Sequence, residues 1–211
     1  MKNPITTEAD QFLKTACLAR KRIRVAASQK DLTLMSIGAH IRSCLDHGRL
    51  FQYLPTIPVE AHLRIILLTP EMREEIDEEL LDREAEHRTG AFLADLDHFI
   101  GGGEITIGDR RDKHAFLKRL EPEGEQVWEL RSIDPQPSVR AFGTFADTDI
   151  LVLTHMRLRT ELGGFNSRAF RQEIRRTRQI WHGIFAPYRP LASEKVTDYV
   201  KENVMDLRNT R

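Results

Sequence analysis

The sequence predicts an α+β protein, with a helical N-terminal region followed by a core of strands and helices. Apolar residues recur at helical spacing through residues 6–29 and again in a second helix that ends at Gly48. A β-branched apolar run then predicts a strand at residues 62–68, and three further strand patterns follow between residues 127 and 158. With 211 residues, of which 40% are hydrophobic, the chain is long enough to bury a core.

Two helices are expected after the first of these strands. Thr69-Pro70-Glu71 combines a hydroxyl cap, a proline at the first helical position and an acid in the first turn. The surface from Glu71 to Glu86 is acidic, and we expect Thr89-Gly90 to end this helix. A second helix should cover residues 91–100, and the Gly101-Gly102-Gly103 triplet should close it.

The C-terminal half predicts a meander of strands and then helices. Strands are expected at Val127–Arg131, Val139–Phe145 and Ile150–Leu158, because each is apolar or alternating and turn-rich segments join them. A long helix should follow from about Ser167 to Phe185, and a short one near residues 195–207.

Composition excludes several classes of protein. The chain has 32 basic and 32 acidic residues, so it is neither uniformly basic nor uniformly acidic. The charge is unevenly distributed: residues 1–60 have 9 basic and 5 acidic side chains, residues 61–130 have 9 and 18, and residues 131–211 have 14 and 9. Two cysteines, no apolar run of membrane-spanning length and no signal-like N-terminus lead us to expect a cytoplasmic protein that has no disulfide.

Three strand segments resemble the core of the RelE/HigB superfamily of toxins, including its phage-derived branch. They are Val127-Trp-Glu-Leu-Arg131, Ser138-Val-Arg-Ala-Phe142 and Leu151-Val-Leu-Thr-His-Met-Arg-Leu-Arg159. The resemblance covers about residues 62–186. It implies a strand-helix-helix-strand-strand-strand core with a curved antiparallel sheet on two helices. The implied activity is that of a ribosome-dependent messenger-RNA endonuclease that uses neither a metal nor a cofactor.

The resemblance also implies a division of the chain and a catalytic site. Residues 1–60 would form a helical extension, residues 61–190 the RelE-like domain and residues 191–211 a helical tail. Carried over by position, the site would contain Arg131, Arg140 and Arg157, with Arg159 just after them. This sequence departs from the pattern in two ways. Glu129 stands where some relatives have a lysine, and the tyrosine that follows the last strand is absent.

The chemistry of RNA cleavage gives these residues different roles. Arginine stabilises negative charge on a phosphate, but its pKa above about 12 makes it a poor proton carrier. A proton carrier must therefore come from elsewhere. His155 lies two positions before Arg157 and should share its strand face, and His182 is a second candidate. In the alternative interpretation, the arginines pair with acids on the sheet and His155 is structural.

The expected C-terminal helix has an apolar and a basic stripe. The apolar stripe consists of Phe170, Ile174, Trp181 and Phe185. The basic stripe, a candidate RNA-binding surface together with Arg159, consists of Arg171, Arg175, Arg178 and His182, with Arg168 and Arg176 beside it. This surface fits an RNA backbone. It also fits the acidic helix at residues 71–86 of the same chain or of a partner, or plain exposure to solvent.

Two other patterns are weaker. His40, Cys44 and His47 would share one face of a helix, as zinc ligands do, but no fourth ligand stands at a matching spacing and we expect no metal. The basic run Arg20–Arg24 suits either nucleic acid or a solvated helix surface.

The expected partners follow from the leading hypothesis, which is an RNA-binding toxin or phage-encoded effector. They are RNA or the ribosome, an antitoxin protein and a second copy of the chain, and no membrane. The alternative hypothesis is a non-catalytic protein-interaction or prophage accessory protein with a RelE-like fold. In a third, the first two helices cover the arginine concavity as an internal antitoxin.

Overall fold

The computed structural model describes residues 36–58, 62–81, 85–109, 112–164 and 167–209. The chain forms two units, residues 1–43 and 44–211. The helix expected at residues 6–29 lies outside the described residues, and so do Arg20–Arg24. Helix α2 (Ile37–Asp46) begins after Ser36, whose Oγ accepts a hydrogen bond from the Ala39 amide at 3.2 Å. Gly48 follows the helix with φ +66°, a conformation that glycine adopts without strain.

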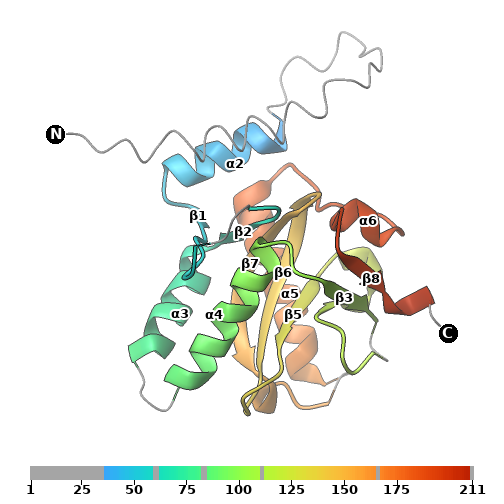
Figure 1. Ribbon diagram of the computed structural model, residues 1–211. Coiled ribbons are helices and arrows are strands. Elements are labelled where there is room, and N and C mark those ends of the chain that lie inside the picture. The colour runs from blue at the N-terminus through green and yellow to red at the C-terminus, as the bar shows by residue number, and fades with distance from the viewer. Residues whose placement is uncertain (1–35, 59–61, 82–84, 110–111, 165–166, 210–211) are drawn as a thin grey trace, which may run out of the picture. The chain divides into compact units, whose positions relative to one another are not determined.

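A mixed eight-stranded sheet occupies the centre of residues 44–211, within the described part of the chain (Figure 1). Its order is β1-β2-β7-β6-β5-β4-β3-β8. The strands are β1 (Phe51–Gln52), β2 (Ile65–Leu68), β3 (Ile105–Gly108), β4 (Leu117–Arg119), β5 (Trp128–Ser132), β6 (Val139–Asp147), β7 (Ile150–Leu158) and β8 (Val204–Asp206). The three predicted C-terminal strands are present as β5, β6 and β7.

The expected curved antiparallel sheet makes up only part of this sheet, which is mixed. The neighbouring strands from β4 to β7 are antiparallel, but β2 runs parallel to β7, and β3 runs parallel to both β4 and β8. Parallel pairing needs a long connection, and two helices separate β2 from the strands that follow it in sequence. The sheet also includes β1 and β8, so it extends into regions that the sequence assigned to the N-terminal extension and the C-terminal tail.

Helices cover both faces of this sheet (Figure 1). Helices α3 (Pro70–Leu81) and α4 (Glu86–Ile100) lie on one face, and α5 (Arg168–Phe185) lies on the other. The short helix α6 (Val196–Tyr199) and the 3-10 turns η2 (Glu123–Glu125), η3 (Arg159–Glu161) and η4 (Leu207–Asn209) complete the described elements.

Two predicted helix boundaries were wrong. Thr89 and Gly90 lie inside α4 rather than at a helix end, because the buried face of α4 continues through them to Phe92 and Phe99. A glycine inside a helix costs about 1 kcal/mol relative to alanine, and burial of that apolar face offsets the cost. The helix expected at residues 195–207 is only the four-residue α6, since the chain then turns to pair β8 with β3.

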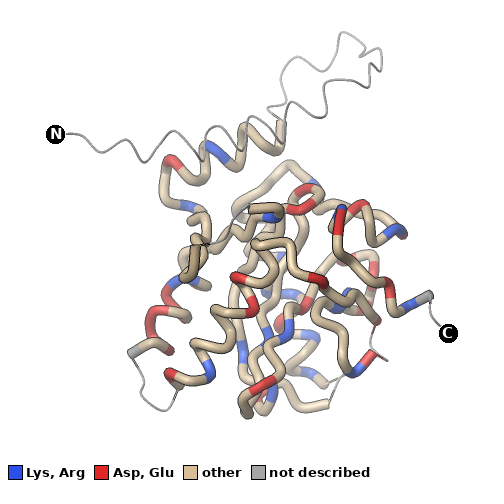
Figure 2. Tube along the Cα trace, in the orientation of Figure 1, with Lys and Arg blue, Asp and Glu red and all other residues tan. Residues whose placement is uncertain are grey.

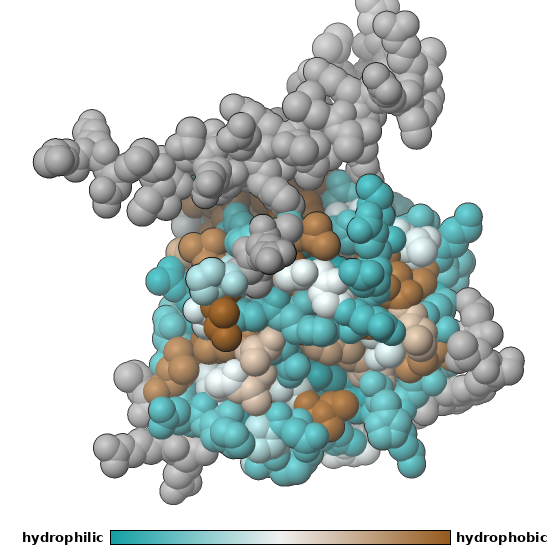
Figure 3. All heavy atoms as spheres, in the orientation of Figure 1, coloured by the Kyte–Doolittle hydropathy of each residue, from teal (hydrophilic) through white to brown (hydrophobic). Residues whose placement is uncertain are grey.

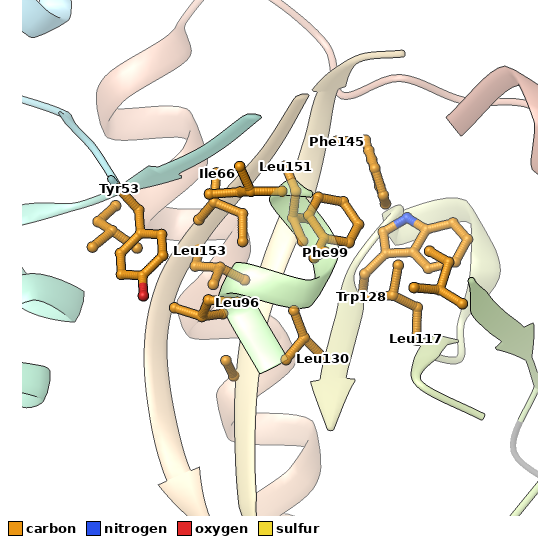
Figure 4. Close-up of a cluster of buried hydrophobic side chains, with 14 of the residues drawn as sticks. Tyr53, Ile66, Leu96, Phe99, Leu117, Trp128, Leu130, Phe145, Leu151 and Leu153 are labelled. Atoms are coloured by element: carbon orange, nitrogen blue, oxygen red, sulfur yellow. The ribbon is translucent and has the colours of Figure 1, made fainter. Parts of the chain in front are cut away.

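The core has two parts, one on each face of the sheet. The larger part lies between the sheet and helices α3 and α4, and includes Phe99, Leu130 and Leu153 (Figure 4). Within it, the Trp128 ring lies 5.3 Å from the ring of Phe145 and 4.7 Å from the ring of Tyr199. The smaller part lies between the sheet and α5, and consists of Leu120, Val127, Phe142, Leu162, Phe170 and Ile174. Burial on both faces explains why β6 is apolar along most of its length.

The surface outside these core regions is mostly hydrophilic on the face seen in Figure 3, with apolar side chains in small separate areas. The large exposed apolar residues are Leu54, Ile57, Leu63, Leu80 and Met205. Among the described helices, none is long and apolar enough to cross a membrane.

The start of α3 gives a direct test of the sequence-based cap. The Oγ1 atom of Thr69 accepts a hydrogen bond from the Met72 amide at 3.2 Å and donates one to the Thr154 carbonyl of β7 at 2.7 Å. We expect Thr69→Ala to lower the free energy of unfolding by about 1–2 kcal/mol in urea titrations. Thr69→Ser keeps the hydroxyl and should lose much less. Equal losses in the two variants would contradict this role of the hydroxyl.

Candidate functional site

The three arginines predicted from the strands lie side by side in the sheet. Arg131 of β5 pairs in register with Arg140 of β6, which pairs in turn with Arg157 of β7. Residues directly opposite each other in antiparallel strands point to the same face. The structure therefore brings these residues together in one row, here called the arginine row.

Glu129 neutralises two members of this row. Its Oε1 atom lies 2.7 Å from Nε of Arg140 and 3.7 Å from Nε of Arg131, and only 3% of Glu129 is exposed. Burial raises the pKa of the Glu129 carboxyl, and the nearby cations Arg140, Arg131 and Lys118 oppose that shift. Burial also lowers the pKa of Arg140 to about 10, which Glu129 counteracts. Glu129 thus acts as a shared counterion inside the protein.

Arg131 and Arg140 also donate hydrogen bonds to backbone carbonyls. Arg140 donates to the carbonyls of Ser132 and Val139, and Arg131 donates to those of Lys113 and Ala115. Arg140 is 4% exposed. Both guanidinium groups therefore serve to hold strand ends and a loop together, a role that the sequence reasoning kept open as its structural alternative.

The other two residues of the predicted catalytic set, His155 and Arg157, lie beside acidic residues of α3 and α5. An NH group of Arg157 lies 2.9 Å from Oε1 of Glu75 on α3, and its Nε lies 3.5 Å from Oε1 of Glu173 on α5. His155 has no exposed surface, its Nε2 lies 2.9 Å from Oε2 of Glu173, and its ring stacks on Phe142 at 5.1 Å. The structure thus places His155 inside the protein, and its role as a proton carrier for a bound RNA stays a prediction.

Glu173 is the central residue of this cluster, and the sequence reasoning missed it. It contacts His155 and Arg157, and its Oε2 lies 3.7 Å from Arg176. The neighbouring His155 ring lowers the pKa of the Glu173 carboxyl, Arg157 adds to this effect and burial opposes it. A signal was present in the sequence, since Glu173 is the one acid within α5 among five arginines.

The basic stripe of α5 lies at the surface of the protein. Its four residues, Arg171, Arg175, Arg178 and His182, are exposed, whereas Phe170, Ile174, Trp181 and Phe185 are buried as predicted. Arg159, the other predicted RNA-binding residue, is the first residue of η3, directly after β7. It interacts electrostatically with Glu129, Arg131 and Arg140, and it donates a hydrogen bond to the Gly163 carbonyl.

Two adjoining cavities follow this stripe, and together they form what we call the basic groove. The first, of about 840 Å³, lies between the second half of α5, η2 and residues 187–192. The second, of about 560 Å³, lies between the first half of α5 and residues 120–125. Both include Glu125, Arg175 and Arg178; Arg171 lines only the second, and His182 and Arg189 line only the first. Arg178 and Glu125 form an ion pair where the cavities meet.

Arg189 is a further groove residue that the sequence reasoning missed. The segment Pro187-Tyr188-Arg189-Pro190 follows α5 and forms a wall of the first cavity. A basic and an aromatic residue between two prolines, directly after a basic helix, were the available signal.

Several acidic residues lie along α3 (Figure 2), and two of them pair with arginines outside the basic stripe. Glu71 of α3 pairs with Arg176 and Glu75 pairs with Arg157, and neither arginine belongs to the stripe. The hypothesis that the stripe docks on the acidic helix of its own chain thus holds only for its neighbour Arg176. Within the residues that the structure describes, no three His, Cys, Asp or Glu side chains are arranged to hold a metal ion.

The role of Glu129 as a shared counterion predicts that its replacement destabilises the protein and that a second substitution restores part of the lost stability. Glu129→Leu would leave Arg140 buried without its carboxylate, and we expect it to lower the free energy of unfolding by about 3–5 kcal/mol. The double variant Glu129→Leu, Arg140→Met should be more stable than Glu129→Leu alone, because it removes the unpaired charge as well. Urea titrations check both, with the exposed Glu104→Leu as the control. A Glu129→Leu variant as stable as the wild type would contradict the role of Glu129.

The lowered pKa of Glu173 predicts a dependence of stability on pH. Because folding lowers this pKa, ionised Glu173 stabilises the fold above the unfolded value of about 4.5, and that contribution disappears as the pH falls through the folded value. Glu173→Gln should therefore be less stable than the wild type at pH 7, and the difference should shrink below about pH 4.5. Urea midpoints from pH 7 to pH 3 measure it, with exposed Glu74→Gln as the control. A difference that grows toward low pH would contradict the assignment.

Comparison of the chain with protein-family models, with curated proteins and with solved structures gave no match in any of the three. An assignment of function therefore depends on the arginine row and the basic groove themselves.

Proposed function

We propose that this protein binds RNA along the basic groove of α5. The observation that carries the proposal is a line of exposed arginines on adjoining cavities, from Arg171 through Arg175 and Arg178 to Arg189, with His182 beside them. An arginine guanidinium matches a phosphate with two parallel donors. Cations at successive turns of one helix give a polyanionic chain several phosphate contacts, each of which releases a counterion.

The order of elements supports RNA as the polyanion. The chain has β2, then α3 and α4, and after β3 and β4 the strands β5, β6 and β7 in succession, which resembles the strand-helix-helix-strand-strand-strand order that the RelE/HigB resemblance implies. The sheet is larger than that order requires, because β1, β3, β4 and β8 extend it. The likeness of order favours RNA over other anions, while the groove itself supplies the contacts.

Binding is proposed here without strand cleavage. The arginine row is paired with Glu129, Glu75 and Glu173, and His155 is buried, so these side chains offer no exposed proton carrier; His182, the second candidate, is exposed on the basic groove and not beside the row. Stabilisation of a transition state needs charges aimed at the reacting phosphate. In this protein those charges point at carboxylates of the chain itself.

The direct test measures the anisotropy of a fluorescein-labelled single-stranded RNA between 50 and 200 mM salt. We expect the wild type to bind, and Arg171→Gln, Arg175→Gln to bind more weakly, with a slope of log K against log salt smaller by about 1.4. The control Lys195→Gln, Lys201→Gln removes the same charge from exposed residues that line neither cavity and should leave binding unchanged.

Two results would overturn this proposal. One is equal binding by the groove variant and the control variant. The other is no RNA binding by the wild type, which together with binding of an acidic polypeptide would support the protein-interaction hypothesis instead. A DNA oligonucleotide of the same sequence tests the contribution of the 2′-hydroxyl, and equal affinity for DNA would extend the ligand class to single strands in general.

A further inference from the structure

The first cavity of the basic groove has a composition that backbone binding alone does not require. Three arginines and a histidine lie on its walls: Arg175, Arg178 and His182 from α5, and Arg189 from the segment after it. Beside them the wall contains Trp181, Tyr188, Pro187, Pro190 and Ala192. A phosphate backbone is satisfied by cations at the surface. A recess that combines cations with aromatic and apolar groups suits a ligand with one anionic end and one planar apolar end.

The walls of this cavity are fixed by contacts in the body of the protein. The indole nitrogen of Trp181 donates to the Tyr188 carbonyl at 3.1 Å, and the Leu191 amide donates to the Phe145 carbonyl of β6 at 2.9 Å. These bonds attach both ends of the segment 187–192 to α5 and to the sheet. The prolines at 187 and 190 further restrict its backbone.

The opposite wall is held by Tyr199. Its hydroxyl donates to Oε1 of Gln126 at 2.8 Å, and it lies 2.7 Å from the Ser193 amide, which donates to it. Tyr199 is fully buried beside Trp128 and Phe145. The Tyr199 side chain thus links Gln126, which lines the cavity, to Ser193, which directly follows the segment 187–192. The recess is therefore already formed in the protein alone, so that little ordering is needed when a ligand binds.

We propose that the first cavity binds a single nucleotide unit, with its phosphate among Arg175, Arg178, His182 and Arg189 and its base against Tyr188. The proposal rests on the proposed RNA binding, of which it names the most specific contact. The cavity volume of about 840 Å³ lies within the range of small-molecule sites, which is roughly 300–1,000 Å³. Stacking of a base on an aromatic ring tolerates any sequence, because every base has a π-face.

Glu125 should weaken the binding of a nucleotide in the first cavity. It forms an ion pair with Arg178 at the junction of the cavities, and 25% of its side chain is exposed compared with 55% for Arg178. A phosphate that binds Arg178 must compete with this carboxylate and is repelled by it. Glu125→Gln should therefore bind a nucleotide more tightly, whereas removal of a cation should have the opposite effect.

The experiment titrates the full chain with uridine 5′-monophosphate, adenosine 5′-monophosphate or inorganic phosphate by calorimetry, and tests each as a competitor of the labelled RNA. We expect both nucleotides to bind and compete, and to bind more tightly than inorganic phosphate. Tyr188→Leu should weaken nucleotide binding by roughly five- to a hundredfold, the range for loss of one base stack. Arg189→Gln should weaken it and Glu125→Gln should strengthen it.

Arg171→Gln is the matched control, because Arg171 lines only the second cavity. It should weaken RNA binding and leave nucleotide binding unchanged. Far-ultraviolet circular dichroism and thermal unfolding verify that each variant is folded.

The outcomes separate the two proposals. If RNA binds through Arg171 and Arg175 but neither nucleotide competes, the nucleotide site is overturned and the proposed function remains. If nucleotides bind with the expected dependence on Tyr188 and Arg189 but RNA does not, the RNA proposal fails and the site is one for free nucleotides. Inorganic phosphate that binds as tightly as a nucleotide would overturn recognition of the base.

Discussion

The attachment of α5 to the sheet through Glu173 determines both surfaces of this helix. Glu173 contacts His155 and Arg157 on β7, and Phe170 one turn earlier packs edge-on against Phe142 at 5.9 Å. Through these contacts the inner side of α5 is buried, and the helix covers a sheet face that carries several charged residues. Since a helix has one face in and one face out, the same contacts direct Arg171, Arg175 and Arg178 toward solvent.

The net charge of zero thus conceals two groups of arginines with different roles. The first group, on the sheet, is paired with carboxylates that are themselves buried or nearly so, as Arg140 is with Glu129. Such a pair gains little net stability, because desolvation of both charges offsets their attraction, but the loss of either partner is costly. The second group, on α5, is exposed and lines the basic groove, whose walls also carry the acids Glu121 and Glu125. Only the second group can attract a polyanion over a distance.

The sequence predicts the elements with strong local signals and misses those that depend on distant contacts. The strands β5, β6 and β7 and the helix α5 follow the hydrophobic pattern closely, and the Thr69 cap is confirmed at the start of α3. The strand β4 is only three residues long and contains two cations, Lys118 and Arg119, which are buried against neighbouring strands. The strand β8 forms because β3 offers it an edge, against the helical tendency that its own residues suggested. No local pattern contains that information.

In the candidate site, too, the sequence predicts which arginines lie next to each other but not which acids pair with them. The position of a residue therefore did not give its role. Adjacency of Arg131, Arg140 and Arg157 follows from a meander with short turns, so it could be expected from the sequence. Their pairing depends on which acids the fold brings to them, and two of the three come from helices that are distant in sequence. Glu129 was different, because it lies two residues before Arg131 on the same strand and hence on the same face. A carboxylate among cross-strand arginines favours internal pairing over binding of an external anion, since the internal partner is held in place without the entropic cost of association.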